Sequence, residues 1–253
     1  MIPLSAIIIT LNEERNIERC IQSLKGVADE ILVVDSFSSD RTKEICLNAG
    51  IRFLENKWCG YADQKNFAQE KASYDFILSL DADEALSPEL SQSINSVKNS
   101  ATPDIYSFNR LTNYCGKWIR HGGWYPDIKI RLYDRRKCRW TGTIHERLNY
   151  PAKEKVIHLA GDCYHYTFYT ISEHQRQVDK FTSLMAEEEF ANGRRAYWFN
   201  ILLNPVVKFV RDYFFRAGFL DGYEGFIISR ISAYATFLKY AKLKKKRKEE
   251  FST

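Results

Sequence analysis

The chain has 253 residues, of which 45% are hydrophobic and 14% are aromatic. This composition supports a large buried core and excludes a predominantly disordered protein. The formal net charge of +5 is unevenly placed, because residues 195–253 carry 12 basic against 5 acidic residues while the remainder carries 25 against 27. We therefore expect an acidic partner, if one exists, to meet the C-terminal part of the chain.

Neither a leader peptide nor a membrane-spanning helix is expected. Met1 leads directly into a strand-like apolar run without a basic leader segment. No charge-free apolar stretch reaches the roughly 18 residues that a spanning helix needs. The six cysteines include no Cys-x-x-Cys pair, and their spacing fits neither a zinc site nor a disulfide framework. We expect reduced, mostly buried thiols in a cytoplasmic protein.

The first third of the chain alternates between apolar strands and amphipathic helices. In the first expected helix, Ile17, Cys20, Ile21 and Leu24 recur at the spacing of one buried face. This alternation predicts βαβ units and therefore an α/β fold with parallel strands and right-handed crossovers. The expected strands cover residues 4–10, 30–35, 51–54 and 74–81.

The pattern changes after a helix that Ser87 and Pro88 should begin. Short strands and loops are expected from Asp104 onward, followed by a long helix. Two amphipathic helices come next; Asn204 and Pro205 are expected to begin the first, and the second runs into a lysine-rich stretch. We therefore predict one α/β domain over residues 1–193, with halves at 1–100 and 101–193. A helical, basic appendage is expected over residues 194–253.

Three carboxylates stand within four residues, Asp81, Asp83 and Glu84, where the strand ending at residue 81 stops. They repel one another unless positive charge lies between them. Asp81 and Asp83 lie on the same side of an extended chain. Mg²⁺ or Mn²⁺ takes one or two carboxylates and completes its shell with phosphate oxygens. The cluster therefore predicts a metal that bridges protein and phosphate. The simpler interpretation is a solvated turn before a helix.

Polar residues also follow the other predicted strands. Thr10, Asn12 and Glu13 follow the first, and Asp35 ends the second. In open α/β sheets, ligands bind outside the carboxyl ends of the strands, where such groups converge. Asp35 is suited to accept a hydrogen bond from a base or a ribose hydroxyl. A turn or a helix cap explains each residue singly, but together they favour a nucleotide crevice.

Three segments, in this order and spacing, resemble the family 2 glycosyltransferases with the GT-A fold. They are Ile-Ile-Ile-Thr-Leu-Asn-Glu-Glu-Arg-Asn-Ile (7–17), Val-Val-Asp-Ser-Phe-Ser-Ser-Asp-Arg-Thr (33–42) and Leu-Asp-Ala-Asp-Glu (80–84). The resemblance implies a Rossmann-like, mostly parallel mixed sheet with helices on both faces. Further segments resemble the bacterial enzymes that add glucose to the inner core of lipopolysaccharide: residues 60–68, 131–133 and 143–146.

The resemblance also implies roles for individual residues at the donor. Asp35 would hold the uracil or ribose of a UDP-sugar, and Asp81 would contact the ribose or the sugar. Asp83 would ligate the metal on the diphosphate, with His165 as a second ligand. The remaining residues implied near the donor are Lys65 and Asn66.

Glu146 would be the base that activates the acceptor, although this sequence has His145-Glu146 where many relatives have Glu-Asp. The chemistry asks for such groups independently. A departing diphosphate needs its charge neutralised, and an acceptor hydroxyl must lose a proton to a carboxylate. In-line attack would then invert the anomeric carbon. Asp127 is the second candidate for the base. The alternatives are a surface ion pair for Glu146, with Arg147 or Arg139, and a core role for His165.

The C-terminal helices place apolar stripes beside many Lys and Arg residues. This pattern favours a location on an anionic leaflet without crossing it. Seven basic residues between 239 and 248 would contribute about 1 kcal/mol each at such a surface. The alternative is that the helices pack on the rest of the protein and end in a solvated basic tail.

We therefore expect a metal-dependent, inverting glycosyltransferase on the inner face of the cytoplasmic membrane. It would move a hexose, glucose from UDP-glucose, to a lipopolysaccharide core or a related glycolipid or oligosaccharide. Alternatives are transfer to polyprenyl phosphate or into another cell-surface polysaccharide. A nucleotidyltransferase should have a glycine-rich loop after its first strand, and residues 10–14 contain no glycine. Nucleic-acid binding is not expected, because the charge is a terminal run rather than a folded face with stacking aromatics.

Overall fold

The computed structural model of the chain describes residues 1–100, 104–142 and 146–250. For residue 250 it describes the backbone but not the side chain. The chain forms two compact units. The first, here called the sheet unit, consists of Met1–Arg110 and Asp127–Tyr166; the second, the helical unit, consists of Leu111–Pro126 and Thr167–Thr253. Two strands, β6 (Ile105–Tyr114) and β11 (Val156–Phe168), contribute residues to both units.

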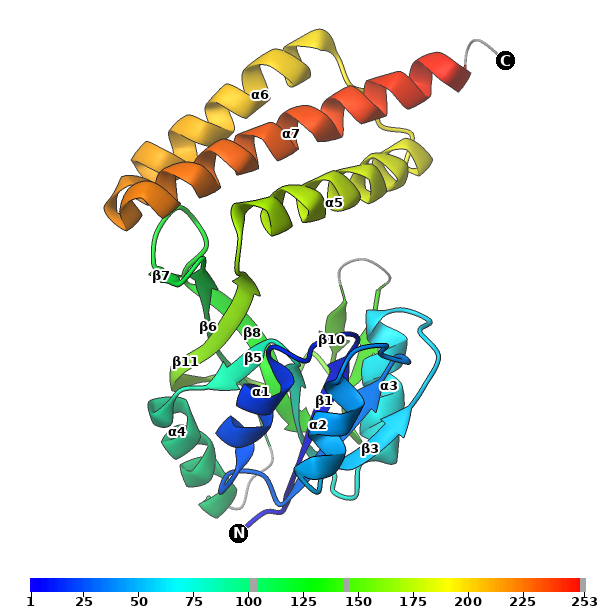
Figure 1. Cartoon of the computed structure of the whole chain (residues 1–253), viewed down its shortest axis with the longest axis vertical. Coiled ribbons are helices and arrows are strands. Elements are labelled where there is room, and N and C mark those ends of the chain that lie inside the picture. The colour runs from blue at the N-terminus through cyan, green and yellow to red at the C-terminus, as the bar shows by residue number, and fades with distance from the viewer. Residues whose placement is uncertain (101–103, 143–145, 251–253) are drawn as a thin grey trace. The chain divides into compact units, whose positions relative to one another are not determined.

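The first half of the sheet unit is built as predicted, from parallel strands joined by helices (Figure 1). Its strands are β1 (Leu4–Thr10), β2 (Glu30–Asp35), β3 (Arg52–Glu55) and β4 (Phe76–Asp81), in the spatial order β3-β2-β1-β4. The helices are α1 (Ile17–Leu24), α2 (Thr42–Asn48), α3 (Tyr61–Lys71) and α4 (Pro88–Asn99). The neighbouring strands of this half are parallel.

Strands beyond β4 extend the sheet in an antiparallel manner. The order continues β4-β8-β6-β11-β5, where β8 is Asp127–Asp134 and β5 is Glu84–Leu86. A separate hairpin-like pair consists of β9 (Arg139–Thr141) and β10 (Arg147–Asn149). The short strand β5 was not predicted, and β11, at 13 residues, is far longer than the short strands expected from Asp104 onward. β5 was missed because the acids at 81–84 favour a turn. The length of β11 was missed because Gly161 and Asp162 are typical of the end of a strand.

Alternating side chains of β1 separate two apolar layers, one on each face of the sheet. Ala6 and Ile8 pack in a cluster with the buried faces of α1, α2 and α4. Ile7 and Ile9 pack in another cluster with α3. Because successive strand residues point to opposite faces, a strand buried on both sides must be apolar throughout. The prediction of an α/β fold with a mixed sheet and helices on both faces is confirmed.

Two local features fix α4 against the sheet. The hydroxyl of Ser87 accepts a hydrogen bond from the backbone N–H of Leu90 at 3.1 Å, as expected of an N-cap before Pro88. Gly161 of β11 has a φ of +94°, and a Cβ placed there would lie 2.3 Å from the backbone nitrogen of Leu90. Only glycine therefore allows β11 and α4 to approach so closely.

The helical unit contains β7 (Lys117–Ile119) and the helices α5 (Ile171–Ala191), α6 (Trp198–Val210) and α7 (Gly222–Glu250). A π-helical turn (Arg211–Phe215) and a 3₁₀ turn (Gly218–Asp221) join α6 to α7. Figure 1 shows α7 with α6 along one side and α5 along the other. None of the helices that the structure describes combines the length and the apolar character needed to cross a membrane.

The predicted start of α6 at Asn204 and Pro205 is wrong. The helix begins six residues earlier, at Trp198, and Pro205 lies inside it. Proline removes one helical hydrogen bond and usually ends a helix at the preceding residue, which is why the sequence favoured a start there. In the structure, the side-chain oxygen of Asn200 accepts a hydrogen bond from the N–H of Tyr197 at 2.9 Å and supports the earlier start.

Candidate active site

The carboxyl ends of β2, β1 and β4 bring the predicted residues to one edge of the sheet. Thr10 pairs with Asp35 in register, and Ile9 pairs with Asp81. Since β2 and β4 flank β1, their ends lie about 10 Å apart, which is two strand spacings. The prediction that polar residues from several strand ends converge is therefore supported for Asp35 and the acids after β4.

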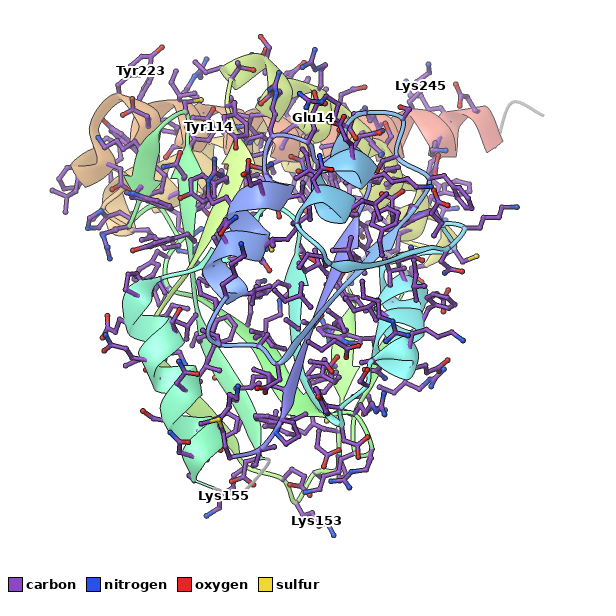
Figure 2. All side chains as sticks on the ribbon, turned by 60° about the horizontal axis from the view of Figure 1, so that its bottom comes forward. Glu14, Tyr114, Lys153, Lys155, Tyr223 and Lys245 are labelled. Atoms are coloured by element: carbon purple, nitrogen blue, oxygen red, sulfur yellow. The ribbon has the colours of Figure 1, made fainter. Side chains whose placement is uncertain are left out.

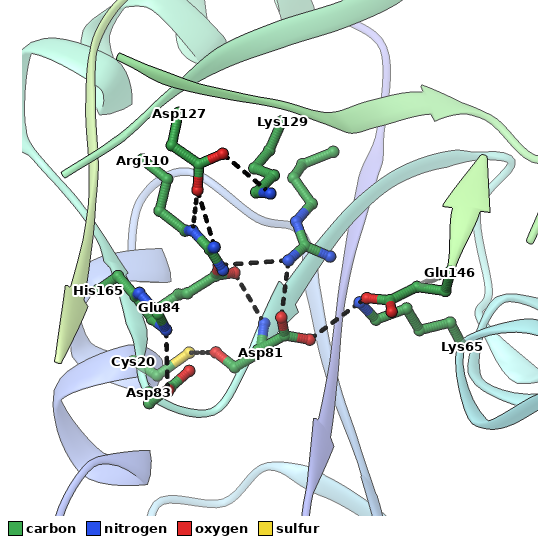
Figure 3. A network of polar contacts seen from close by, with 11 residues as sticks. Cys20, Lys65, Asp81, Asp83, Glu84, Arg110, Asp127, Lys129, Glu146 and His165 are labelled. Atoms are coloured by element: carbon green, nitrogen blue, oxygen red, sulfur yellow. Dashed lines mark hydrogen bonds and ion pairs between the residues drawn. The ribbon is translucent and has the colours of Figure 1, made fainter. Parts of the chain in front are cut away.

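A fully buried lysine joins two of the predicted site residues. Lys65 of α3 lies 3.1 Å from an oxygen of Asp81 and 2.9 Å from an oxygen of Glu146 (Figure 3). The ammonium also lies over the Trp140 ring, at 4.8 Å from its centroid. A single cation therefore sits within hydrogen-bond reach of two carboxylates that are 65 residues apart in the chain. The alternative partners expected for Glu146, Arg147 and Arg139, are replaced by Lys65.

Two arginines compensate the remaining charge around β4. Arg131 of β8 is buried, and its guanidinium contacts Asp81 at 2.7 Å and Glu84 at 3.3 Å. Arg110 of β6 contacts Glu84 at 3.3 Å and Asp127 at 2.8 Å. Lys129 also contacts Asp127, at 3.0 Å. Asp127, the second candidate for the base, is thus held between two cations.

These cations change the acidity of the buried groups. Burial alone would raise the pKa of Asp81, but Arg131 and Lys65 outweigh it and hold that pKa well below its usual range. Burial would lower the pKa of Arg131, yet Asp81 and Glu84 raise it well above the ordinary value. Asp81 therefore stays ionised at any physiological pH, and the mutual repulsion of the acids is relieved within the protein.

Asp83 differs from its neighbours Asp81 and Glu84. Its carboxylate lies 3.2 Å from Nε2 of His165 on β11, and the described residues place no lysine or arginine in an ion pair with it. Both side chains are partly exposed, at 25% for Asp83 and 13% for His165. In the described part of the chain, no three His, Cys, Asp or Glu side chains are arranged around one metal position. Asp83 offers a carboxylate of the kind that Mg²⁺ and Mn²⁺ sites use, and His165 adds an imidazole nitrogen beside it.

The pKa of Glu13 is raised at this edge of the sheet, by burial and by nearby negative charges. Burial raises its pKa to about 7, with further contributions from the charges of Asp83, Asp40 and Asp81, against a lowering hydrogen bond from Asn16. A carboxyl group that holds its proton near neutrality in an acidic surrounding indicates a place where added positive charge is favourable.

The loops after β1 and β2 are tied together by their own polar groups. The buried carboxylate of Asp35 accepts hydrogen bonds from both the N–H and the hydroxyl of Ser38. Asn12 donates its N–H to the Ser38 hydroxyl at 2.7 Å and accepts the N–H of Ser39 at 2.8 Å. These contacts shape the edge of the crevice. Whether Asp35 also contacts a nucleotide stays a prediction.

Two other residues expected near the donor are buried in distinct ways. The amide of Asn66 both donates to and accepts from the Trp140 backbone, at 2.9 and 3.0 Å, so it holds β9 against α3. The Thr10 hydroxyl is buried and has no hydrogen-bond partner among the described residues. Their predicted contacts with the donor remain predictions, as do all of the roles assigned above.

Sequence reasoning gave no individual role to Arg110 or Arg131, and it included Glu84 only as a member of the acidic cluster. A signal for one of them was present, because Arg131 stands inside the apolar run Ile130–Tyr133 of a strand and a buried arginine requires an acidic partner. Of the segment around the predicted base, Thr143, Ile144 and His145 lie outside the described residues.

Comparison with known proteins identifies the family. The sequence profile described as glycosyl transferase family 2 matches residues 5–163. A lipopolysaccharide core biosynthesis glycosyltransferase of Rhizobium meliloti is 31% identical over 96% of this chain and 92% of its own length. A Rickettsia typhi protein described as an uncharacterized glycosyltransferase is 32% identical over 95% of this chain and 86% of its own length.

The solved structures that align with this chain are more distant. TarS of S. aureus aligns with a TM-score of 0.49 and 14% identity, over 73% of this chain and 40% of that chain. A glucosyl-3-phosphoglycerate synthase of Mycobacterium tuberculosis, solved with Mn²⁺ and UDP, aligns with a TM-score of 0.37 and 21% identity, over 44% of each chain. This chain thus spans less than half the length of either structure. The family profile and the near full-length relatives are sufficient by themselves: this chain belongs to the family 2 glycosyltransferases and is an enzyme that transfers sugars.

Proposed function

We propose that the enzyme transfers a hexose, glucose from UDP-glucose, to a sugar of a lipopolysaccharide core, with inversion at the anomeric carbon. The observation that carries this proposal is the pair of carboxylates held by Lys65. Asp81 lies where the donor sugar is expected at the end of β4, and Glu146 lies on the other side of the same ammonium. The reaction needs one protein group beside the donor sugar and a base beside the acceptor hydroxyl, because the attacking and leaving oxygens lie on opposite sides of the reacting carbon.

Glu146 is the residue that would accept the proton of the acceptor hydroxyl. Its side chain is 21% exposed, so it is open to solvent on one side while Lys65 fixes the other. A base must be held within hydrogen-bond reach of the proton that it removes, and this single contact limits the rotation of the carboxylate. Lys65 is therefore a positioning residue, and Asp127 is less suited to the role because Arg110 and Lys129 already contact it.

Asp83 and His165 are the residues that would hold a divalent cation. Their side chains approach within 3.2 Å of each other, and both lie at the edge of the sheet where the diphosphate is expected. The donor set fits, because Mg²⁺ and Mn²⁺ commonly take one or two protein ligands and fill the remaining positions with phosphate oxygens and water. When bound, such a cation would neutralise the charge that develops on the departing UDP.

The acceptor class is proposed from the nearly full-length relative of Rhizobium meliloti, which is described as a lipopolysaccharide core biosynthesis enzyme. A glycolipid acceptor also agrees with a location on the inner face of the cytoplasmic membrane. Transfer of labelled glucose to truncated lipopolysaccharide, with polyprenyl phosphate as the competing acceptor, separates the two acceptor classes. Labelling of polyprenyl phosphate alone would overturn the proposed acceptor.

The metal and donor sites are tested by replacing Asp83 with Ala. We expect loss of transfer and of metal-dependent UDP binding, measured by calorimetry, while the melting temperature stays close to that of the parent enzyme. Glu70→Ala is the matched control, since it removes an exposed carboxylate of the same unit that pairs with exposed Arg139. Unchanged turnover in Asp83→Ala would contradict the assignment.

A further inference from the structure

The segment from α6 to the start of α7 leaves large apolar side chains exposed. In the described structure, none of the 13 residues of α6 is buried. Exposed apolar residues then continue through the π-helical and 3₁₀ turns, and Tyr223 points outward from the beginning of α7 (Figure 2). We call this set the apolar face: Tyr197, Trp198, Phe199, Leu202, Leu203, Val206, Val207, Phe214, Phe215, Phe219, Leu220 and Tyr223.

A groove within the helical unit continues this face. It has a volume of about 630 Å³ and is lined by side chains of α5, α6 and α7. Leu202 and Val206 belong to both the groove and the apolar face. Single exposed apolar residues are ordinary, but twelve of them within residues 197–223, next to an apolar groove, are typical of an interaction surface.

The ionisable groups of the same segment indicate which charge a partner covering the apolar face should carry. Asp212 is buried and is surrounded by three cations: Lys208 at 2.6 Å, Arg211 at 2.9 Å and Arg216 at 3.6 Å. One carboxylate cannot balance three cations, so positive charge is left over beside the apolar residues. Because the arginines are about half exposed, that excess charge is open to solvent.

The other acid of the segment is also withdrawn from the surface. Asp221 is buried, and its carboxylate accepts the backbone N–H groups of Arg120 and His121. The segment thus presents apolar and cationic groups outward and keeps its two carboxylates inside. This combination is complementary to anionic headgroups above acyl chains.

The lysine-rich end of α7, by contrast, is largely engaged with α5. Lys242 contacts Asp179 at 2.8 Å, Lys246 contacts Glu187 at 3.2 Å, and Arg247 donates to the carbonyl oxygen of Phe190 at 2.9 Å. These contacts within the helical unit neutralise part of their positive charge. The sequence favoured both the apolar stripes and the basic residues of the C-terminal helices for contact with a membrane. The structure leaves the apolar side chains of α6 exposed, while these three basic residues of α7 have partners within the unit.

We propose that residues 197–223 form the surface with which the enzyme docks on an anionic lipid bilayer, with the apolar face in the headgroup–acyl boundary and the cations around Asp212 among the headgroups. This deepens the proposed location at a membrane and rests on it. A second copy of the chain is a poorer occupant, because a two-fold interface would bring the same surplus cations together. A spanning arrangement is not needed, since an amphipathic helix lies in the plane of the interface.

Flotation of the full-length enzyme with vesicles tests the proposal. Vesicles of phosphatidylcholine alone are compared with vesicles that also contain phosphatidylglycerol. The test variant is Leu202→Asp/Val206→Asp, which places charge on the apolar face. The control is Lys245→Ala/Lys248→Ala, which removes two exposed lysines from the end of α7, where Lys245 projects away from the helix (Figure 2).

We expect the parent enzyme to float with the anionic vesicles and the test variant to bind at least about tenfold more weakly, since two apolar side chains leave the acyl region. The control should lose no more than about twofold. A reversed order, with the control impaired and the test variant unaffected, would overturn the proposal. So would sedimentation of a stable dimer that the test variant dissociates, together with no vesicle binding by the parent.

Two further measurements keep the result interpretable. Circular dichroism melting shows whether the test variant is folded, and Phe215→Ser offers a milder change at a side chain that is 83% exposed. Calorimetry with UDP-glucose, measured without vesicles, should give the same affinity for the parent and the test variant. Loss of vesicle binding with intact donor binding concerns docking alone, whereas absent donor binding in the parent would contradict the proposed function instead.

Discussion

The two units of this protein depart from ordinary burial in opposite directions. The sheet unit buries charged side chains, among them Lys65, Glu84 and Arg131. The helical unit exposes apolar ones, above all along α6. A buried charge costs several kcal/mol unless it is paired, and an exposed apolar patch lowers solubility.

The difference teaches where each unit acts. In the sheet unit, the buried charges around β4 lie in a network of opposite charges, so their cost is offset and their positions are fixed. In the helical unit, the exposed side chains have no such compensation within the described structure, so their surface is completed only from outside. A fixed polar site suits chemistry, and an uncovered apolar face suits docking. The predictions that follow test the two sides of this contrast.

The largest effect is expected from Glu146→Gln, which keeps the shape of the proposed base and removes its ability to take a proton. The rate of transfer should fall about a hundred- to ten-thousandfold, the usual contribution of a general base. The dissociation constant of UDP-glucose should change little. Asp127→Asn is the comparison: if that variant were inactive and Glu146→Gln active, the base would be the second candidate.

Lys65→Met breaks the bridge between Asp81 and Glu146. We expect the free energy of unfolding to fall by about 3–5 kcal/mol, because the change leaves two carboxylates without their shared cation. The transfer rate should fall with it. Urea denaturation measures the first effect, and Lys71→Met, at an exposed lysine of the same helix, should be close to neutral. Equal stability of the two variants would show that the bridge does not hold the site.

Glu13 makes the sheet unit sensitive to rising pH. Burial raises its pKa to about 7, against about 4.5 in the unfolded chain, so the folded state binds the extra proton between these values. Stability should therefore decline as the pH rises from about 4.5 through 7, by on the order of 3 kcal/mol. Urea denaturation at pH 5 and pH 7.5 should show this decline in the parent enzyme and a smaller one in Glu13→Gln. Parallel curves would refute the raised pKa.

His174 gives the helical unit the opposite response. Burial lowers its pKa to about 4, and its ring stacks on Phe168 at 4.5 Å, with Nδ1 3.1 Å from the Tyr114 hydroxyl. The unfolded state binds more protons between pH 6.5 and 4, so stability should be lost as the pH falls through that window. This effect vanishes above neutrality, which makes it the smallest under physiological conditions. Melting curves of His174→Gln at pH 7 and pH 5 should differ less than those of the parent.

Much of the sheet unit was predictable because local pattern and tertiary burial agree there. The strands at residues 4–10 and 30–35 have the expected bounds, and the four apolar residues of α1 are all buried. Ser87 caps its helix as expected. The acids after β4 do gather with residues of other strands, since parallel strands end at one edge of a sheet.

The partners of those acids were less accessible to prediction. Arg110 and Arg131 reach Glu84 because β8 pairs antiparallel with β4 and β6 pairs antiparallel with β8, an arrangement that no local pattern encodes. The same limit applies to Lys65. The family resemblance implied that this residue lies near the donor, but it did not indicate the bridge to Glu146. In α6, the rule that proline begins or ends a helix misplaced the start, because the cap at Tyr197 and Asn200 begins the helix before Pro205.

The passage of β6 and β11 through both units has a practical consequence for dissecting the enzyme. Two of the three changes of unit, after Arg110 and after Tyr166, lie inside continuous strands, and the third, after Pro126, lies directly before β8. Ending the polypeptide at Tyr166 would deprive Tyr114 and Ile119 of Phe168 and Ile228, with which they share a core. Deletion of the C-terminal helices would thus damage a segment encoded far upstream, so point substitutions, rather than shortened genes, are the sound route to separating sugar transfer from attachment.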